Sequence, residues 1–254
     1  MLEGIETGYE GKFDFPPRHG PPQRSYMLAS VPRTGSTYLS HLLWQTGCLG
    51  APLEYLNFDP AGPYFFAATS TENQSWLWDS VVRRRTSPNG IFGVKCFPSQ
   101  LQILEESNPK LLQQVMALLT GDGAAAKVVL LKRADRDAHA ISYARAIPSG
   151  VWRKEQEASG NTEVEFSRLA VRRARQALDA QESAWTEMFS ELRIDPLVLC
   201  YEEVVANPRA AVRAVGDYVG AVLAEQAGVE IPAVERQSEA DSRAWAERYA
   251  ASKA

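Results

Sequence analysis

A short loop in the first fifth of the chain combines the residue types that bind a phosphate group. The apolar run 26–30 has the character of a buried strand, the loop 31–37 (VPRTGST) follows it, and a helical pattern begins at Ser36. Free N–H groups and the dipole at a helix N-terminus attract an anion, and Arg33 and Gly35 add a cation and a tight turn. The spacing indicates an anion cradle, although a glycine turn before a capped helix explains the loop alone equally well.

The loop is not a Walker A motif, which has the pattern G-x-x-x-x-G-K-[ST]. That pattern would need a lysine in place of Ser36 and a glycine in place of Ala29 or Ser30. Arg33 supplies the positive charge from an earlier position, where we expect it to reach the bridging oxygens of a phosphate ligand. A kinase or another P-loop nucleotide hydrolase is therefore disfavoured and stays a rival hypothesis.

A second basic element follows another apolar run. The run 128–131 ends in Lys132 and Arg133, and Asp135 opens a helix that carries Ser142 nine residues after Arg133. Ligands of open parallel sheets bind beyond the carboxyl ends of the strands, so we expect Arg33 and Arg133 to face one crevice. Two phosphate sites in one crevice favour a nucleotide that carries phosphates at both ends.

The elements that must position these residues form a predicted mixed α/β domain. Continuous apolar runs of the kind found in parallel strands covered on both faces occur at 26–30, 91–96, 128–131 and 197–200. Helical patterns begin at Ser36 and then span 76–85, 101–106, 109–120, 135–147, 162–192, 208–219 and 238–251. Without an internal repeat or a dividing linker, we expect one domain over 1–254, with 1–22 as an irregular N-terminal arm.

Composition excludes several classes of protein. The 254 residues are 45% apolar and 23% charged, which is typical of a folded chain, and a net charge of −4 argues against a nucleic-acid partner. Three cysteines match neither a zinc site nor a disulfide framework, so we expect the reducing cytoplasm, and the three histidines have no metal-ligand spacing. No secretory signal and no apolar run near the roughly 20 residues of a membrane helix are present.

Several short motifs, in the same order along the chain, resemble the bacterial trehalose 2-sulfotransferase family. They are Leu28-Ala29-Ser30, Gly35-Ser36-Thr37, Thr46-Gly47, Pro52-x-Glu54, Pro88-Asn89-Gly90-x-x-Gly93-x-Lys95, Val151-Trp152-Arg153 and Glu235-Arg236-Gln237. The matches run from about Tyr26 to Tyr249, nearly the whole chain. The family pattern has no equivalent of Val31 or Pro32, and other carbohydrate sulfotransferases share the proline version of the loop. The acceptor therefore stays open.

The resemblance implies a P-loop-like sulfotransferase fold, a central mostly parallel sheet flanked by helices, and a homodimer. It implies 3′-phosphoadenosine 5′-phosphosulfate (PAPS) as the sulfuryl donor, a carbohydrate acceptor and no metal. The loop 31–37 resembles the 5′-phosphosulfate loop of the PAPS enzymes, and Arg133 with Ser142 resembles their 3′-phosphate element. The residues that the resemblance assigns to the donor are Arg33, Thr34, Gly35, Ser36, Thr37, Arg133, Ser142, Arg236 and Gln237.

The acceptor hydroxyl must lose its proton as its bond to sulfur forms, so a general base is expected. The resemblance places a catalytic glutamate at Glu54, and Arg33 would stabilise the charge that develops on the leaving phosphate. A solvated loop glutamate is the alternative for Glu54. Lys95 is predicted to contact the transferring group or the sugar, or else to point into water from a strand end.

Trp152 and Arg153 follow a turn and suit sugar recognition, because an aromatic face and a guanidinium fit pyranose C–H and hydroxyl groups. Core packing is the alternative for Trp152. The basic runs at 83–85 and 172–175 are interpreted as solvated helix faces. The rival functions are sulfation of another sugar, a glycolipid or a small-molecule hydroxyl, and nucleotide binding by a P-loop-like protein without sulfotransfer.

Overall fold

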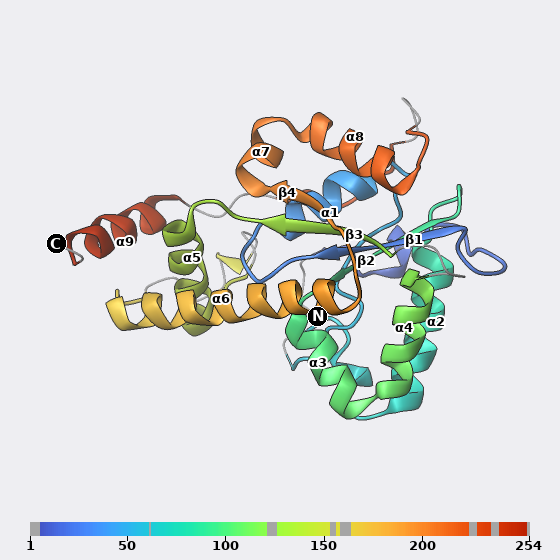
Figure 1. Cartoon of the computed structure of the whole chain (residues 1–254), viewed down its shortest axis with the longest axis horizontal. Coiled ribbons are helices and arrows are strands. Elements are labelled where there is room, and N and C mark those ends of the chain that lie inside the picture. The colour runs from blue at the N-terminus through green and yellow to red at the C-terminus, as the bar shows by residue number, and fades with distance from the viewer. Residues whose placement is uncertain are drawn as a thin grey trace.

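A four-stranded parallel sheet forms the centre of the molecule, with the strand order β2-β1-β3-β4 (Figure 1). The computed structural model describes residues 6–60, 62–120, 126–152, 156–157, 164–223, 228–234 and 239–252. The strands are β1 (Arg24–Ala29), β2 (Ile91–Cys96), β3 (Lys127–Lys132) and β4 (Leu197–Cys200). All four predicted strands are confirmed to within two residues at each end, and with them the α/β class.

The carboxyl ends of the strands meet at one edge of the sheet because every pairing is parallel. Ala29, the last residue of β1, lies opposite Cys96 of β2 and Leu130 of β3. Lys132 at the end of β3 lies opposite Cys200 at the end of β4. The segments that leave these strands, including the loop 31–37, therefore emerge side by side.

Helices cover both faces of the sheet (Figure 1). The side chains of Tyr26 and Leu28 pack into one apolar cluster, and those of Met27 and Ala29 pack into another, as the alternation of a strand requires. The first cluster lies under α1 (Ser36–Gln45), α7 (Tyr201–Ala206) and α8 (Pro208–Val219). The second lies against α2 (Thr71–Arg85), α3 (Pro98–Ser107), α4 (Pro109–Thr120) and α6 (Arg168–Glu191).

Further helices lie beyond the carboxyl end of β3 (Figure 1), and their apolar side chains form a third cluster with those of α6. There α5 (Arg136–Ser149) packs against the first half of α6 and against α9 (Glu239–Ala251). The second half of α6 enters the main core through Trp185 and Phe189, whose rings stack with centroids 5.4 Å apart. The long helix α6 therefore joins the sheet core to the helices that carry part of the site.

Local capping explains where several helices begin. The side chains of Ser70, Asp135, Ser167 and Asn207 each accept a hydrogen bond from an N–H of the first turn of the following helix. The helix α8 has the predicted bounds, with Asn207 as its cap. Sequence analysis missed α7, because a six-residue helix that directly follows a strand has too short an apolar pattern to be recognised.

The N-terminal arm is held against the domain by Arg85, which was expected on a solvated helix face. That expectation is wrong, because Arg85 is 2% exposed. Its Nη1 donates to the carbonyl of Gly8 (2.9 Å), its Nη2 donates to that of Glu10 (3.2 Å), and its Nε lies 2.9 Å from Asp14 Oδ1. A buried guanidinium needs such partners, and here the arm supplies them.

The cysteines Cys48 and Cys96 are buried and Cys200 is partly buried, and all three are free thiols. Burial raises the pKa of Cys96 well above its usual value, and the charge of Glu54 adds to the effect. Within the described residues, no helix combines the length and the apolar character that crossing a bilayer requires.

Candidate active site

The loop between β1 and α1 presents free backbone N–H groups at the sheet edge. Gly35 caps α1 in the left-handed conformation, with φ 89°, and a Cβ there would lie 2.2 Å from the ring of Tyr201. Glycine is therefore required both for the backbone angle and for the close approach of the ring. The N–H of Leu39 bonds to the carbonyl of Gly35, which leaves the three N–H groups before it, at residues 36–38, without an intrahelical acceptor.

The side chain of Thr34 shapes this loop from the inside. Thr34 is fully buried, and its hydroxyl donates to the carbonyl of Val31. Ser36 is also buried at the first position of the helix, whereas Thr37 is partly exposed. Of the loop hydroxyls predicted to bind the donor, that of Thr34 is thus engaged by the loop itself.

Lys95 joins the loop to Glu54. Its ammonium lies 2.8 Å from Glu54 Oε1 and donates to Thr37 Oγ1 at 3.1 Å. The lysine side chain is 2% exposed and the glutamate side chain is 16% exposed. The structure therefore contradicts two alternatives: Lys95 does not point into water, and Glu54 is not a solvated loop residue.

Backbone pairing at the edge of the sheet brings Glu54 to Lys95. Leu53 forms a parallel bridge with Val94, and the N–H of Lys95 donates to the carbonyl of Leu53 at 3.0 Å. Two amides complete the surroundings of the carboxylate, since Asn57 Nδ2 and Gln100 Nε2 donate to Glu54 Oε2 at 3.1 and 3.3 Å. Sequence analysis missed both amides.

The side chains of Arg33 and Arg133 lie near one another beyond the carboxyl ends of β1 and β3. Arg133 Nη1 donates to the carbonyl of Arg33 at 3.2 Å, and its guanidinium lies 5.2 Å from the centroid of the Tyr201 ring. Arg33 Nε donates to Ser142 Oγ at 3.0 Å and Arg33 Nη1 donates to the carbonyl of Trp152 at 2.5 Å. The Arg33 side chain thus contacts Ser142 directly, in the same group of residues as Arg133.

Positive charge is concentrated at this group. Burial and, to a smaller extent, the nearby charges of Arg133 and Arg145 lower the pKa of Arg33 to about 10. Arg33 remains protonated at neutral pH, so three positive charges lie near one another here. Arg133 Nε is buried without a hydrogen-bond partner among the described residues, and the carboxylate of Glu202 lies 3.9 Å away. A buried donor of this kind fits an anionic ligand.

Glu202 stabilises the turn that follows Arg133. Its carboxylate accepts hydrogen bonds from the N–H groups of Ala134 (3.0 Å) and Asp135 (3.2 Å) and from the thiol of Cys200 (3.0 Å). Burial opposes the ionised form, but these hydrogen bonds outweigh it and lower the pKa of Glu202 to about 2. Sequence analysis gave Glu202 no role.

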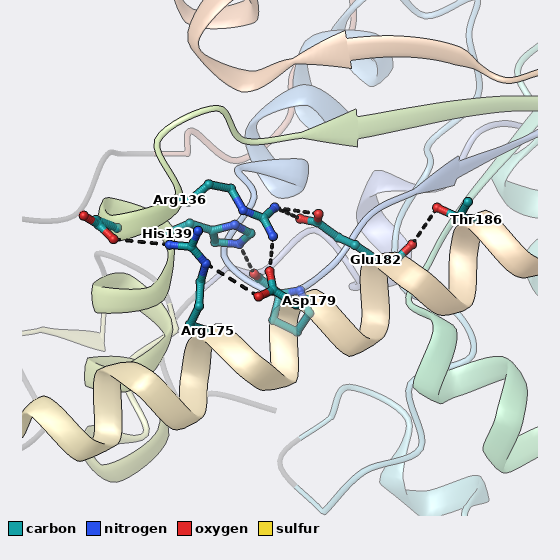
Figure 2. Close-up of polar contacts among 8 residues, drawn as sticks. Arg136, His139, Arg175, Asp179, Glu182 and Thr186 are labelled. Atoms are coloured by element: carbon teal, nitrogen blue, oxygen red, sulfur yellow. Dashed lines mark hydrogen bonds and ion pairs between the residues drawn. The ribbon is translucent and has the colours of Figure 1, made fainter.

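An ion-pair network fixes α5, the helix of Ser142, on α6 (Figure 2). Arg136 Nη1 lies 2.5 Å from Glu182 Oε2, and Arg136 also pairs with Asp179. Arg175, expected on a solvated face, pairs with Asp137 at 3.2 Å and with Asp179 at 3.6 Å. These pairs hold the helix where its side chains reach the loop.

His139 connects α5 directly to the loop 31–37, since its Nε2 lies 2.8 Å from the carbonyl of Pro32. The carbonyl is an acceptor, so Nε2 carries a proton. Burial lowers the pKa of His139 to about 4, so the ring is neutral at pH 7. The position of the loop therefore depends on α5 as well as on β1.

Trp152 lies at the Arg33 side of the site. The residue is 41% exposed, so core packing is excluded, and its ring centroid lies 6.3 Å from that of Tyr143. Arg153, Arg236 and Gln237 lie outside the described residues. The preceding segment 228–234 contacts α1, where the N–H of Val229 donates to the carbonyl of Gln45 at 3.1 Å. Among the described residues, no group of three or more His, Cys, Asp or Glu side chains could hold a metal ion.

The chain is similar to two curated trehalose 2-sulfotransferases. The trehalose 2-sulfotransferase of Mycobacterium tuberculosis is 27% identical, over 90% of this chain and 95% of that protein. The enzyme of the same name from Mycolicibacterium smegmatis is 24% identical, over 89% and 94%.

The chain is also similar to solved structures of sulfotransferases. STF9 from Mycobacterium avium gives a TM-score of 0.48 at 15% identity, over 91% of this chain and 69% of that one. A sulfotransferase from Alicyclobacillus acidocaldarius gives 0.43 at 16% identity, over 90% and 92%. The family model of the Stf0 sulphotransferases matches residues 25–252. With its parallel sheet, its strand-loop-helix cradle and this match over most of its length, the chain belongs to the Stf0 sulphotransferase family.

Proposed function

We propose that this sulfotransferase moves a sulfuryl group from PAPS to a hydroxyl of a carbohydrate, with trehalose as the first acceptor to test. One observation carries the proposal: Lys95 bridges Thr37 at the anion cradle to the carboxylate of Glu54. A base thus lies beside the position where a transferable anionic group would bind. The two curated relatives, named for trehalose, support the choice of acceptor.

The donor would bind across the crevice. Its phosphosulfate would meet the N–H groups of residues 36–38 and the hydroxyls of Ser36 and Thr37, where the helix dipole favours negative charge. Its 3′-phosphate would meet Arg133 and Ser142, and the buried Arg133 Nε offers a donor for it. Arg33, bonded to Ser142, would lie between the two phosphate positions.

Sulfuryl transfer needs positioning and cations, because its transition state is loose, as in phosphoryl transfer. The acceptor oxygen forms a bond to sulfur while the bond from sulfur to the 5′-phosphate oxygen breaks. The products are a sulfate ester and 3′-phosphoadenosine 5′-phosphate (PAP). Glu54 takes the proton of the acceptor hydroxyl, and the ammonium of Lys95 stabilises negative charge between Glu54 and the loop.

The proposal also covers the cell compartment, the oligomeric state and the domain organisation of the enzyme. Free thiols at all three cysteines are compatible with a reducing cytoplasm, and we place the enzyme there. The family resemblance supports a homodimer and one sulfotransferase domain over residues 1–254. Another sugar, a glycolipid or a small-molecule hydroxyl is the alternative acceptor.

Titration calorimetry with PAP tests the donor assignment. We expect micromolar binding to the wild-type protein and at least tenfold weaker binding to Arg133→Met, because a charge-assisted contact is removed. Adenosine 5′-phosphate, which lacks the 3′-phosphate, should lose little affinity on the same substitution. Absence of PAP binding to the wild-type protein would remove the donor assignment.

A sulfation assay with labelled PAPS and a panel of sugars tests the role of Glu54. Glu54→Gln should keep PAP affinity within twofold and lower kcat by about 10²- to 10⁴-fold, as expected on loss of a general base. Glu106→Gln, at an exposed position on α3, makes the same chemical change away from the site and should leave kcat unchanged. Unchanged turnover in Glu54→Gln would end its role as base.

A further inference from the structure

We propose that Gln100 is a positioning residue that holds the carboxylate of Glu54 in one orientation and sets the pH range in which Glu54 accepts a proton. The inference deepens the proposed function and rests on it, since it concerns the base of the same reaction. Gln100 lies in the first turn of α3, is 6% exposed, and was not recognised in the sequence.

The hydrogen bonds of Gln100 determine which way its amide points. Its Oε1 accepts the N–H of Phe97 at 3.0 Å, and its Nε2 lies 3.3 Å from Glu54 Oε2. An N–H can only be accepted by the amide oxygen, so the NH₂ group must face Glu54. The bond to Phe97 is the ordinary contact of a glutamine in the first turn of a helix. The second bond has no part in capping, because it leaves the helix and ends on the carboxylate.

Both oxygens of the Glu54 carboxylate are held. Lys95 Nζ lies 2.8 Å from Oε1, while Asn57 Nδ2 and Gln100 Nε2 approach Oε2. Asn57 lies three residues from Glu54 on the same loop and moves with it. Gln100 belongs to α3, and its contact therefore ties the carboxylate to a rigid element.

The connection between β2 and α3 carries both of the Glu54 partners that lie far from it in the sequence. Lys95 is the fifth residue of β2, and Gln100 follows it by five residues, in the first turn of α3. Pro98 begins that helix and fixes the corner between strand and helix. A shift of α3 relative to β2 would therefore change the surroundings of both carboxylate oxygens together.

The amide affects proton transfer as well as geometry. A donor to an ionised carboxylate favours the charged form, so loss of Gln100 Nε2 makes protonation of Glu54 easier. Titratable groups that face Glu54 include Lys95 and Cys96 of β2 and Tyr9 of the N-terminal arm, whose hydroxyl accepts the N–H of Glu54 at 3.1 Å. Lys95 and Gln100 therefore act in the same direction on the carboxylate.

The Gln100→Glu variant tests whether Gln100 positions the Glu54 carboxylate, because it keeps the helix-capping bond and removes the donor to Glu54. A glutamate still accepts the N–H of Phe97 and has nearly the same size, but it places a carboxylate oxygen where the NH₂ group donated to Glu54. We expect PAP affinity within twofold of wild type, a kcat lowered at least tenfold, and an acidic limb of the kcat/KM profile shifted to higher pH. Gln100→Met, which removes the donor without adding a charge, should shift that limb in the same direction by less.

Gln102→Glu is the matched control, because it makes the same change at an exposed position two residues further along α3. Its profile should superimpose on that of wild type. A Gln100→Glu profile that coincides with that of wild type or of Gln102→Glu, at normal thermal stability, overturns the proposal. If Gln100→Glu does not fold, the pH profile of Gln100→Met is compared with that of wild type instead. A Gln100→Met profile that coincides with that of wild type then overturns the proposal.

A measurement on the protein alone keeps this test separate from the reaction. The carboxyl carbon of Glu54 can be followed by NMR in protein labelled with ¹³C-glutamate, with Glu54→Gln to assign the signal. Its titration midpoint should lie at higher pH in both Gln100 variants than in wild type, and an unchanged midpoint overturns the positioning role. Absence of sulfation by the wild-type protein refutes the proposed function instead, and leaves this readout intact.

Discussion

At the level of single residues, the ion pair of Lys95 and Glu54 stands out because its lysine is almost completely removed from water. A buried ammonium is tolerated only where it has close partners, and here it has the Glu54 carboxylate and the Thr37 hydroxyl. The pair holds the proposed base next to the cradle. Each member therefore depends on the other for its charge state and its position.

A double-mutant cycle measures this dependence. Lys95→Met and Glu54→Gln should each lower kcat strongly, and the double variant should lose much less than the product of the two losses, because either change alone already disables the pair. The readout is kcat for sulfation at saturating PAPS. Losses that simply multiply would show that the two residues act independently.

His139 makes stability depend on pH. Its ring is 1% exposed, and burial lowers its pKa to about 4 in spite of the bond to Pro32, with a further contribution from the charge of Arg133. In the unfolded chain the histidine has its ordinary pKa of 6.5 and binds a proton first as the pH falls. Its share of stability is therefore complete above pH 6.5 and is lost as the pH falls to about 4.

Urea unfolding between pH 7 and pH 4 checks this prediction. The wild-type protein should lose about 3 kcal/mol from this group over the window, and His139→Gln, which still carries an N–H donor but does not titrate, should lack that part of the slope. His19→Gln, at an exposed position, is the control and should keep the wild-type slope. Equal slopes in wild type and His139→Gln would contradict the prediction.

At the level of elements, the N-terminal arm supports the loop that carries Glu54. The rings of Tyr9, Tyr55 and Tyr64 pack against one another, with the Tyr9 and Tyr64 centroids 5.5 Å apart. Arg85 of α2 binds the arm on both sides of Tyr9, through the carbonyls of Gly8 and Glu10. The arm thus packs against the loop that carries Glu54.

Removing the buried arginine should therefore release the arm. Arg85→Met leaves Asp14 and two carbonyls without their partner, and we expect a loss of about 2–4 kcal/mol in the free energy of unfolding, together with faster proteolysis of residues 6–15. Arg84→Met is the matched control, because Arg84 pairs with the same Asp14 from a 55% exposed position. Arg84→Met should lower the free energy of unfolding by less than about 1 kcal/mol. Similar losses in the two variants would contradict this role of Arg85.

At the level of the whole molecule, the site depends on three connections at one sheet edge. The loop after β1 supplies Arg33 and the cradle, the turn after β3 supplies Arg133, and Tyr201 follows β4. A ligand that bridges these connections binds only the folded chain. Donor binding should therefore stabilise the entire domain.

Thermal unfolding with PAP tests that expectation. At a PAP concentration of about 100 times Kd the stabilisation should be about 2.7 kcal/mol, which raises Tm by roughly 5–10 °C for a chain of this size. Adenosine 5′-phosphate at the same concentration should give a smaller shift. In Arg133→Met the two ligands should give similar shifts, and a full PAP shift in that variant would contradict the role of Arg133.

The sequence by itself determined the features that depend on neighbouring residues. The four strands were recognisable because each is a continuous apolar run, and α8 because Asn207 and Pro208 mark its first turn. The loop 31–37 before α1 was recognisable for the same reason, since its glycine, hydroxyls and helix start lie within a few residues of one another.

The tertiary structure alone decided how Lys95, Glu54 and Gln100 meet, and that Arg85 binds the arm. Lys95 and Glu54 lie far apart in the chain, and they meet because Leu53 pairs with the edge of β2 in one register. Local preferences do not specify such a register; it follows from which apolar side chains the folded core buries together. A lysine at a strand end has the same local sequence whether it faces water or a carboxylate, so only its packed surroundings show its role.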